Sequence, residues 1–206
     1  MYSSSINKLI LALKKLPSVG ERTAERYVFH WLKSGKKEVT ELILSLKDLI
    51  DKIKSCEICW DFSDQSPCPI CSDLKRDRST VCVVTESQDL LVVEQTGIFK
   101  GVYHCLRELL DAGDEESLTR LKASELFDRI NGKTGFNKKI PIKEIILALN
   151  PDLPGETTMM YLEKEIKKMQ PKIKITRLAR GLPLGADLRY ADEITLGSAI
   201  NNRTSK

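Results

Sequence analysis

Four cysteines in one short segment have the types and spacing that could carry chemistry. Cys56, Cys59, Cys68 and Cys71 form two Cys-x-x-Cys pairs that are separated by eight residues. Each pair lets the chain turn back so that two thiolates reach one ion, and two pairs complete a tetrahedral four-thiolate zinc site without an open position. The spacing therefore predicts one structural Zn²⁺ per chain. We expect Trp60 and Phe62 to cover the sulfurs.

Other uses of these cysteines fit the sequence less well. Disulfides are rare in chains without a secretion signal, and the N-terminus shows none. A dithiol redox centre normally uses one pair beside a βαβ pattern, whereas this segment has two pairs in a polar loop. The remaining cysteines, Cys82 and Cys105, stand alone in apolar runs, where we expect small buried side chains.

The residues before this segment predict a helical hairpin. Apolar residues from Ile6 to Leu13 follow helical spacing, Pro17 cannot continue that helix, and a second amphipathic helix begins at Glu21. We expect Gly20 to supply the backbone freedom of the turn. Backbone N–H groups at the start of the second helix favour an anion such as phosphate. The predicted DNA-backbone contacts are Lys14, Gly20, Arg22 and Arg26.

Two further expectations concern the same region. His30 has no cluster of partners in the sequence, so we expect it to be a packed helix residue. A third amphipathic helix, ELILSLKDLIDKIKSC, carries an apolar stripe that we expect to be core. The stripe consists of Leu42, Ile43, Leu46, Leu49, Ile50 and Ile53.

Charge is distributed unevenly along the 206 residues. Residues 1–54 hold 11 Lys and Arg against 6 Asp and Glu, whereas the other 152 residues hold 22 against 23. The N-terminal excess could neutralise phosphates, although on charge alone a solvated helix face with surplus lysines is the favoured explanation. No apolar run approaches the roughly 18 residues that span a bilayer. We expect a cytoplasmic protein without membrane contact.

After Thr80, short β-rich runs alternate with amphipathic segments, which predicts a parallel sheet covered by helices. Functional residues of such sheets gather at the carboxyl ends of strands, here Glu86 and Asn150-Pro151-Asp152. Two interpretations of these acids stay open. Glu86, Asp89 and Asp152 could bind Mg²⁺ weakly, or they could cap helices at a solvated edge.

Three segments together resemble the bacterial RecR family of recombination mediators. They are LPSVGERTAERYVFHWL, NPDLPGETT and RLARGLPLGADLRYADEITLGSAI, and they stand in the family's order around the four cysteines. The chain departs from the family pattern at Ser18, which is usually glycine, and at Pro154, which is usually glutamate. Residues 111–139 show no family pattern, and we expect an exposed insertion there.

The resemblance implies an α+β multi-module fold. The expected modules are a helix-hairpin-helix DNA-binding module over residues 1–54, a four-cysteine zinc finger over 55–72, an α/β Toprim domain with a parallel sheet over 79–176, and a C-terminal segment in subunit contacts over 177–206. Toprim enzymes place a glutamate after one strand and an Asp-x-Asp after a later strand to hold Mg²⁺. Asn150 replaces the first of those aspartates, which removes one hard anionic ligand.

The resemblance further implies a non-enzymatic DNA clamp and mediator of recombinational repair. It would act with RecO and RecF, help to load recombinase on gapped or single-stranded DNA, and form a ring-like homotetramer at the nucleoid. The edge that carries Glu86, Asp89, Asn150, Asp152 and Glu156 would dock partners. The alternatives are a Mg²⁺-dependent Toprim nuclease or nucleotidyl transferase, and a zinc-stapled adaptor that does not touch DNA.

Overall fold

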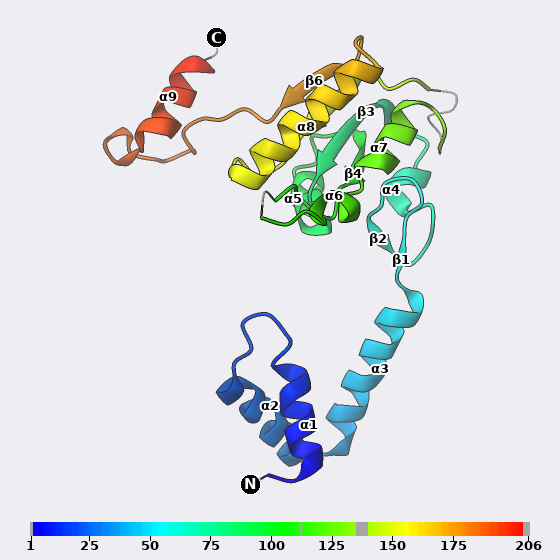
Figure 1. The fold of residues 1–206 in the computed structure, drawn as a ribbon, viewed down its shortest axis with the longest axis vertical. Coiled ribbons are helices and arrows are strands. Elements are labelled where there is room, and N and C mark those ends of the chain that lie inside the picture. Colours follow the sequence, from blue (N-terminus) through cyan, green and yellow to red (C-terminus); the bar gives the residue numbers. More distant parts are fainter. Residues whose placement is uncertain (1, 112, 135–139, 204–206) are drawn as a thin grey trace. The chain divides into compact units, whose positions relative to one another are not determined.

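The computed structural model describes residues 2–111, 113–134 and 140–203 (Figure 1). The chain divides into two compact units, Met1–Ile53 and Lys54–Lys206, and each is described by itself. No helix among the described residues combines the length and apolar character that crossing a membrane requires.

The first unit consists of three helices, α1 (Ser4–Leu13), α2 (Glu21–Ser34) and α3 (Lys36–Lys52). Ser3 caps α1 by accepting a hydrogen bond from the backbone N–H of Ile6. The small core contains Ile10, Ala24 and Val28, with Ile6, Leu13 and Val19 packed against it. The predicted helices are confirmed.

The expectation that the stripe of α3 is core is wrong for this chain taken alone. No residue of α3 is buried, and Ile50 remains 79% exposed. The helical period placed these side chains on one face correctly. It could not tell a face covered within one chain from a face that the chain leaves open.

The second unit begins with the cysteine segment. Strand β1 (Lys54–Ser55) pairs antiparallel with β2 (Phe62–Ser63), and the short helix α4 (Pro69–Ser72) follows. Cys68 caps α4, with Pro69 at its first position. Each Cys-x-x-Cys pair thus lies in a turn or at a helix start.

The rest of this unit is an α/β module. Its elements are β3 (Asp77–Val84), α5 (Ser87–Gln95), β4 (Gly101–Cys105), α6 (Ser117–Arg120), α7 (Ala123–Ile130), β5 (Glu144–Leu147), α8 (Leu153–Met169) and β6 (Lys174–Arg177). The four strands are parallel in the order β4-β3-β5-β6. The predicted parallel sheet is confirmed.

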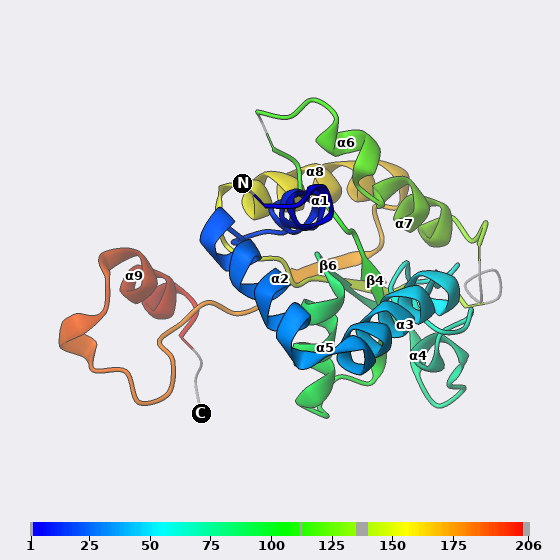
Figure 2. The same ribbon diagram turned by 90° about the horizontal axis from the view of Figure 1, so that it is seen from below.

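Alternate residues of the strands face opposite layers, as the two-residue period of a strand requires. Val81 and Val83 pack with Leu126 of α7 and Leu162 of α8. Cys82 and Val84 face the other way, toward Leu90 of α5, so α5 lies on the opposite face from α7 and α8 (Figures 1 and 2). Both lone cysteines are buried strand residues, as expected.

The expectation of an exposed insertion at 111–139 is wrong where the structure describes that region. Helix α7 places Leu126 and Ile130 in the main core, and Arg129 is only 2% exposed. The apolar face of α7 was not recognised in the sequence, because Arg129 is counted as a polar residue although it is buried. Residue 112 and residues 135–139 lie outside the described residues.

The C-terminal segment contains the 3-10 turn η2 (Leu188–Tyr190) and α9 (Glu193–Asn201). Asp192 caps α9 through a 2.8 Å hydrogen bond from the backbone N–H of Thr195. None of the residues of η2 or α9 is buried, and Tyr190 and Ile194 are among the most exposed large side chains.

Candidate metal centre and nucleic-acid interface

The four cysteines of the predicted zinc site converge. Their Sγ atoms all lie within 4.8 Å of one another, and all four side chains are buried. The Sγ atoms of Cys59 and Cys68 are 3.6 Å apart. Four sulfurs about 2.3 Å from a tetrahedral Zn²⁺ would lie about 3.8 Å apart, so the donor set and its geometry fit the ion.

Backbone N–H groups and electrostatics support the same interpretation. The N–H of Cys68 donates to Sγ of Cys56 at 3.3 Å, and the N–H of Cys71 donates to Sγ of Cys68 at 3.4 Å. Hydrogen bonding to Cys56, together with burial, holds the pKa of Cys59 and of Cys71 above the ordinary thiol value, whereas hydrogen bonds from the other three thiols lower the pKa of Cys56. Four thiolates cannot share this space without a cation, and a bound divalent cation removes that obstacle.

The side chains that cover the sulfurs differ from the prediction. Ile58 and Ile70 pack against the cysteines, whereas Trp60 and Phe62 face cations of the α/β module. The guanidinium of Arg107 lies 4.1 Å from the Phe62 ring centroid, and the ammonium of Lys122 lies 4.6 Å from that of Trp60. Both rings therefore lie against cations and not over the sulfurs, in contacts of cation–π type.

Arg107 joins the cysteine segment to the carboxyl end of β4. It donates from Nε to the Trp60 carbonyl at 2.8 Å and from a terminal nitrogen to Oγ of Ser55 at 3.0 Å. We call these two hydrogen bonds and the Phe62 contact the Arg107 bridge. Arg107 has φ +64°, a left-handed conformation that is costly for a residue with a Cβ. Two residues earlier, the N–H of Cys105 donates to the Cys59 carbonyl at 2.8 Å.

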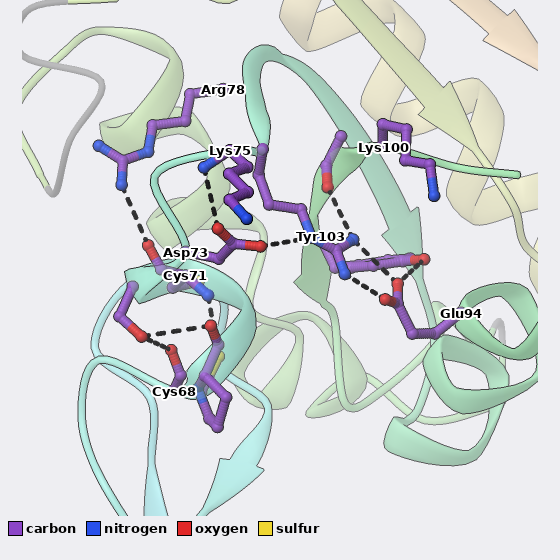
Figure 3. A network of polar contacts seen from close by, with 12 residues as sticks. Cys68, Cys71, Asp73, Lys75, Arg78, Glu94, Lys100 and Tyr103 are labelled. Atoms are coloured by element: carbon purple, nitrogen blue, oxygen red, sulfur yellow. Dashed lines mark hydrogen bonds and ion pairs between the residues drawn. The ribbon is translucent and has the colours of Figure 1, made fainter. Parts of the chain in front are cut away.

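A second connection follows the last cysteine (Figure 3). Arg76 donates to Glu94 of α5 at 3.0 Å, and the Tyr103 hydroxyl of β4 donates to the same carboxylate at 2.7 Å. The hydrogen bond from Arg76 holds the pKa of Glu94 below its usual value. Arg78 donates to the carbonyl of Cys71 at 3.4 Å. The cysteine segment is thus attached to the α/β module both before its first cysteine, through Ser55, and after its last, through Arg76 and Arg78.

The hairpin of the first unit presents cations on one face of α2. Arg22, Arg26 and Lys33 are exposed and line one shallow depression with Glu25, Phe29 and His30. Lys33 was not among the predicted contacts, although its spacing of seven from Arg26 would have placed it on this face. Lys14 pairs with Glu21 at 3.1 Å and so links the end of α1 to the start of α2.

Two expectations about this hairpin are wrong. Gly20 has φ −81°, and a Cβ placed there would meet nothing within 4 Å among the described residues. The left-handed residue is Ser18, with φ +61°, at the position where the family usually has glycine. His30 is not packed: its side chain is 62% exposed, and its Nε2 lies 3.1 Å from a carboxylate oxygen of Glu38 on α3.

The acids at the carboxyl ends of the strands act as helix caps. Glu86 caps α5, and Asp89 accepts a hydrogen bond from the Glu86 backbone N–H at 3.0 Å, which completes a capping box. Asp152 caps α8 by accepting from the Gly155 N–H at 2.8 Å. Among the described residues, only the four cysteines form a group of three or more metal-ligand side chains with donor atoms within 4.8 Å. Glu86, Asp89 and Asp152 do not converge in this way.

Arginines of the C-terminal signature neutralise Glu156. Arg177 donates to Glu156 at 2.9 Å and to Glu163 at 2.7 Å, and Arg180 also pairs with Glu156. Arg177, Arg180, Asp89 and Asn150 line a cleft of about 360 Å³ at this edge. Sequence reasoning missed both arginines as parts of the edge, although they are the first and fourth residues of the RLARGLP segment.

Gly155 fixes the turn between β5 and α8. A Cβ on Gly155 would lie 2.0 Å from the Asn150 carbonyl oxygen and 3.0 Å from a carboxylate oxygen of Asp152. Only glycine therefore lets Asn150 and Asp152 adopt this arrangement. The glycine in NPDLPGETT could have indicated a close backbone approach. The atoms that it must avoid, the Asn150 carbonyl and the Asp152 carboxylate, are visible only in the structure.

Family models match the chain in the order of these modules. They are the RecR helix-hairpin-helix over residues 6–50, the four-cysteine zinc finger domain of RecR over 53–73, the Toprim domain over 79–179 and the RecR C-terminal region over 181–204. Proteins named Recombination protein RecR are similar over the whole chain. That of Moorella thermoacetica is 41% identical over 203 residues, which cover 98% of this chain and 97% of the relative. That of Gloeobacter violaceus is 40% identical, with 98% of both chains covered. The chain belongs to the RecR family of recombination proteins.

Proposed function

We propose that this chain is a non-enzymatic DNA clamp and mediator in recombinational DNA repair. The observation that carries the proposal is the exposed row Arg22, Arg26 and Lys33 on α2, beside the hairpin of the helix-hairpin-helix module. Such a surface offers point charges and backbone N–H groups but no arrangement that reads base edges. It favours sequence-independent, salt-sensitive contact with phosphates.

The first experiment measures DNA affinity as a function of salt for Arg22→Glu/Arg26→Glu. Both residues are exposed, so the fold should persist, as circular dichroism would verify. Loss of two phosphate contacts should lower the slope of log K against log salt by about 1.8 for duplex DNA. The matched control is Lys37→Glu/Lys47→Glu, which makes the same charge change on exposed positions of α3. Equal slopes for the two variants would move the DNA path away from α2.

We propose that the ion of the cysteine site is one structural Zn²⁺ per chain. The support is the converging set of four thiol donors and the match to a four-cysteine zinc finger model. Cys56, Cys59, Cys68 and Cys71 would hold the ion and leave no position for substrate. Elemental analysis should give one zinc per chain, and Cys68→Ala should lower that content and destabilise the segment. Zero zinc in metal-replete protein would reject the assignment.

We further propose a ring-like homotetramer. Two separate surfaces expose large apolar side chains, the stripe of α3 and the C-terminal segment around Tyr190 and Ile194. Exposed apolar surface of this extent is typical of interaction sites, and two distinct surfaces can link subunits into a closed ring. Multi-angle light scattering measures the subunit number, and a monomer at micromolar concentration would contradict the ring.

The absence of catalysis is part of the same proposal. Capping occupies Glu86, Asp89 and Asp152, and two arginines neutralise Glu156, so little anionic charge is left for a pair of divalent cations. The rival nuclease or nucleotidyl transferase would use Glu86 and Mg²⁺. Metal-dependent cleavage or synthesis that disappears in Glu86→Gln would favour that rival.

Partner docking at the Toprim edge rests on the family resemblance. We propose that RecO and RecF bind in the neighbourhood of Glu86 and Glu156, and that the protein acts in the cytoplasm at the nucleoid. The charges there are held in fixed positions by caps and ion pairs, which suits recognition by a complementary surface. The test is a pull-down of the purified partner, which wild type should retain and Glu156→Arg should lose.

The alternative of a zinc-stapled adaptor that does not touch DNA has its own test. A failure of the wild-type protein to bind any nucleic acid at low salt would favour it.

A further inference from the structure

The α/β module separates its charges although its net charge is close to zero. Residues 55–206 hold nearly equal numbers of acids and bases. The acids that cap α5 and α8 stand at the carboxyl ends of the parallel strands. The opposite edge, where the strands begin, carries a run of lysines. We call this second set the basic edge: Lys100, Lys143, Lys167, Lys168, Lys172 and Lys174.

Backbone hydrogen bonds place three of these lysines, Lys100, Lys143 and Lys174, in one row. The N–H of Lys174 donates to the Lys143 carbonyl at 2.9 Å, and the N–H of Lys143 donates to the Ser79 carbonyl at 2.8 Å. On the other side of β3, the N–H of Asp77 donates to the Lys100 carbonyl at 2.9 Å. The row thus crosses all four strands in the order β4-β3-β5-β6.

Helix ends account for only part of this charge. Lys167 and Lys168 lie in the last turn of α8, where cations complement the helix dipole. Lys100 donates to the Gly97 carbonyl just beyond α5. Lys143 and Lys172 have no such reason, because Lys143 precedes β5 and Lys172 lies in the turn between α8 and β6.

Acids balance part of the charge on this edge: hydrogen bonds from Ser79 and Thr80, together with the charge of Lys143, hold the pKa of Asp77 at the start of β3 below its usual value. Lys174 pairs with Glu144 at 3.1 Å, and Lys168 lies 3.9 Å from Glu165. Lys143 and Lys172 are exposed and form no salt bridge with a described residue. The neighbouring apolar residues turn inward: Ile142 is buried, and Ile173 packs against the main core. Between β5 and β6 the described part of the edge therefore presents charge without a large exposed apolar side chain, whereas beside Lys100 the side chain of Ile98 is 83% exposed.

We propose that the basic edge is a second contact surface for DNA phosphates, separate from α2. Protein partners are normally held by buried apolar or aromatic anchors, which this row lacks between β5 and β6. Four strands about 4.8 Å apart give a row about 14 Å wide, and duplex DNA carries roughly eight phosphate charges over that length. Point-charge lysines spread in a row match such a polyanion better than one small anion. The inference rests on the proposed DNA-binding function.

The test is the salt dependence of DNA binding by Lys143→Gln and Lys172→Gln, singly and combined. Each lost phosphate contact should lower the slope of log K against log salt by about 0.9 and weaken duplex binding about eightfold at 0.1 M salt. The combined variant should then bind about 60-fold more weakly. The matched control is Lys37→Gln/Lys54→Gln, which removes two exposed lysines outside both proposed surfaces. Unchanged unfolding midpoints would show that the variants stay folded.

The outcomes separate this inference from the function on which it rests. Binding and slope equal to the control would reject the basic edge, while loss of binding in Arg22→Glu/Arg26→Glu would leave the clamp in place. Wild-type protein that binds no DNA at about 50 mM salt would reject both. Poly-glutamate binding that depends on Lys143 and Lys172, with DNA binding unaffected, would overturn the inference in favour of an acidic protein partner.

Discussion

Replacement of Arg107 by glycine should harm the protein less than replacement by alanine, although glycine is ordinarily the more disruptive residue. Both substitutions remove the Arg107 bridge, with its hydrogen bonds to Trp60 and Ser55 and its contact with Phe62. Only glycine relieves the left-handed backbone at φ +64°. The comparison therefore separates the contacts of the side chain from the strain of its backbone.

The magnitudes follow from these contacts. A charged hydrogen bond to a carbonyl contributes about 1.5 kcal/mol, the half-exposed serine contact about 1, and the cation–π contact about 0.5. Alanine should thus cost about 3 kcal/mol. Glycine relieves about 1.5 kcal/mol of backbone strain. It also lowers stability by about 0.7 kcal/mol, because glycine gives the unfolded chain more conformational freedom. The glycine variant should therefore cost about 2.2 kcal/mol. It should be about 0.8 kcal/mol more stable than the alanine variant, which is roughly a fourfold difference in their unfolding equilibria.

The assay is urea unfolding of zinc-loaded protein followed by the fluorescence of Trp60. The chain has two tryptophans, so a Trp31→Phe background leaves Trp60, which reports on the cysteine segment itself. Arg189→Ala serves as a control, because that side chain is 82% exposed and should shift stability by less than about 0.5 kcal/mol. Glycine as harmful as alanine would refute the strain argument. Two variants as stable as the control would refute the bridge.

Three further outcomes follow from single residues. Gly155→Ala should destabilise the α/β module by about 3 kcal/mol in urea unfolding, because its Cβ would overlap the Asn150 carbonyl and displace the Asp152 cap; a cost below about 1 kcal/mol would contradict this. Burial lowers the pKa of His104 to about 3 from 6.5 in the unfolded chain, so its contribution is complete above pH 6.5 and declines as pH falls toward 3. Wild type should therefore lose up to about 1.4 kcal/mol per pH unit more than His104→Gln between about pH 6 and pH 4, and parallel curves would refute this. Ser18→Gly should raise the stability of the hairpin unit by about 0.8 kcal/mol through relief of its left-handed backbone, measured by the fluorescence of Trp31 in a Trp60→Phe background, and a decrease would contradict the strain.

Local signals in the sequence were enough for the modules. The Cys-x-x-Cys spacing predicted four converging sulfurs, because two short turns alone bring each pair together. The alternation of β-rich and amphipathic runs predicted the parallel sheet, because each crossover helix must cover a face. Both signals are patterns of residues close in the sequence, although the sheet itself pairs β3 with the distant β5.

Contacts between distant residues could not be read in the same way. Arg107 reaches Trp60 across 47 positions, and its positive φ leaves no mark in its residue type. Arg129 is buried although it stands in a charged stretch, so a search for apolar residues at helical spacing did not reveal the core face of α7. The open face of α3 has the same period as a covered one, and only the structure showed that this chain does not cover it.

Retention on circular compared with linear DNA is the measurement that tests the proposed clamp most directly. Zinc-loaded protein is bound to a closed circle and to the same molecule linearised, and both are then challenged with salt well above that which strips short linear DNA. A ring that encloses DNA should stay on the circle and slide off free ends, since topological closure resists dissociation. Equal loss from the two forms would contradict the clamp and reduce the protein to a surface binder of phosphates.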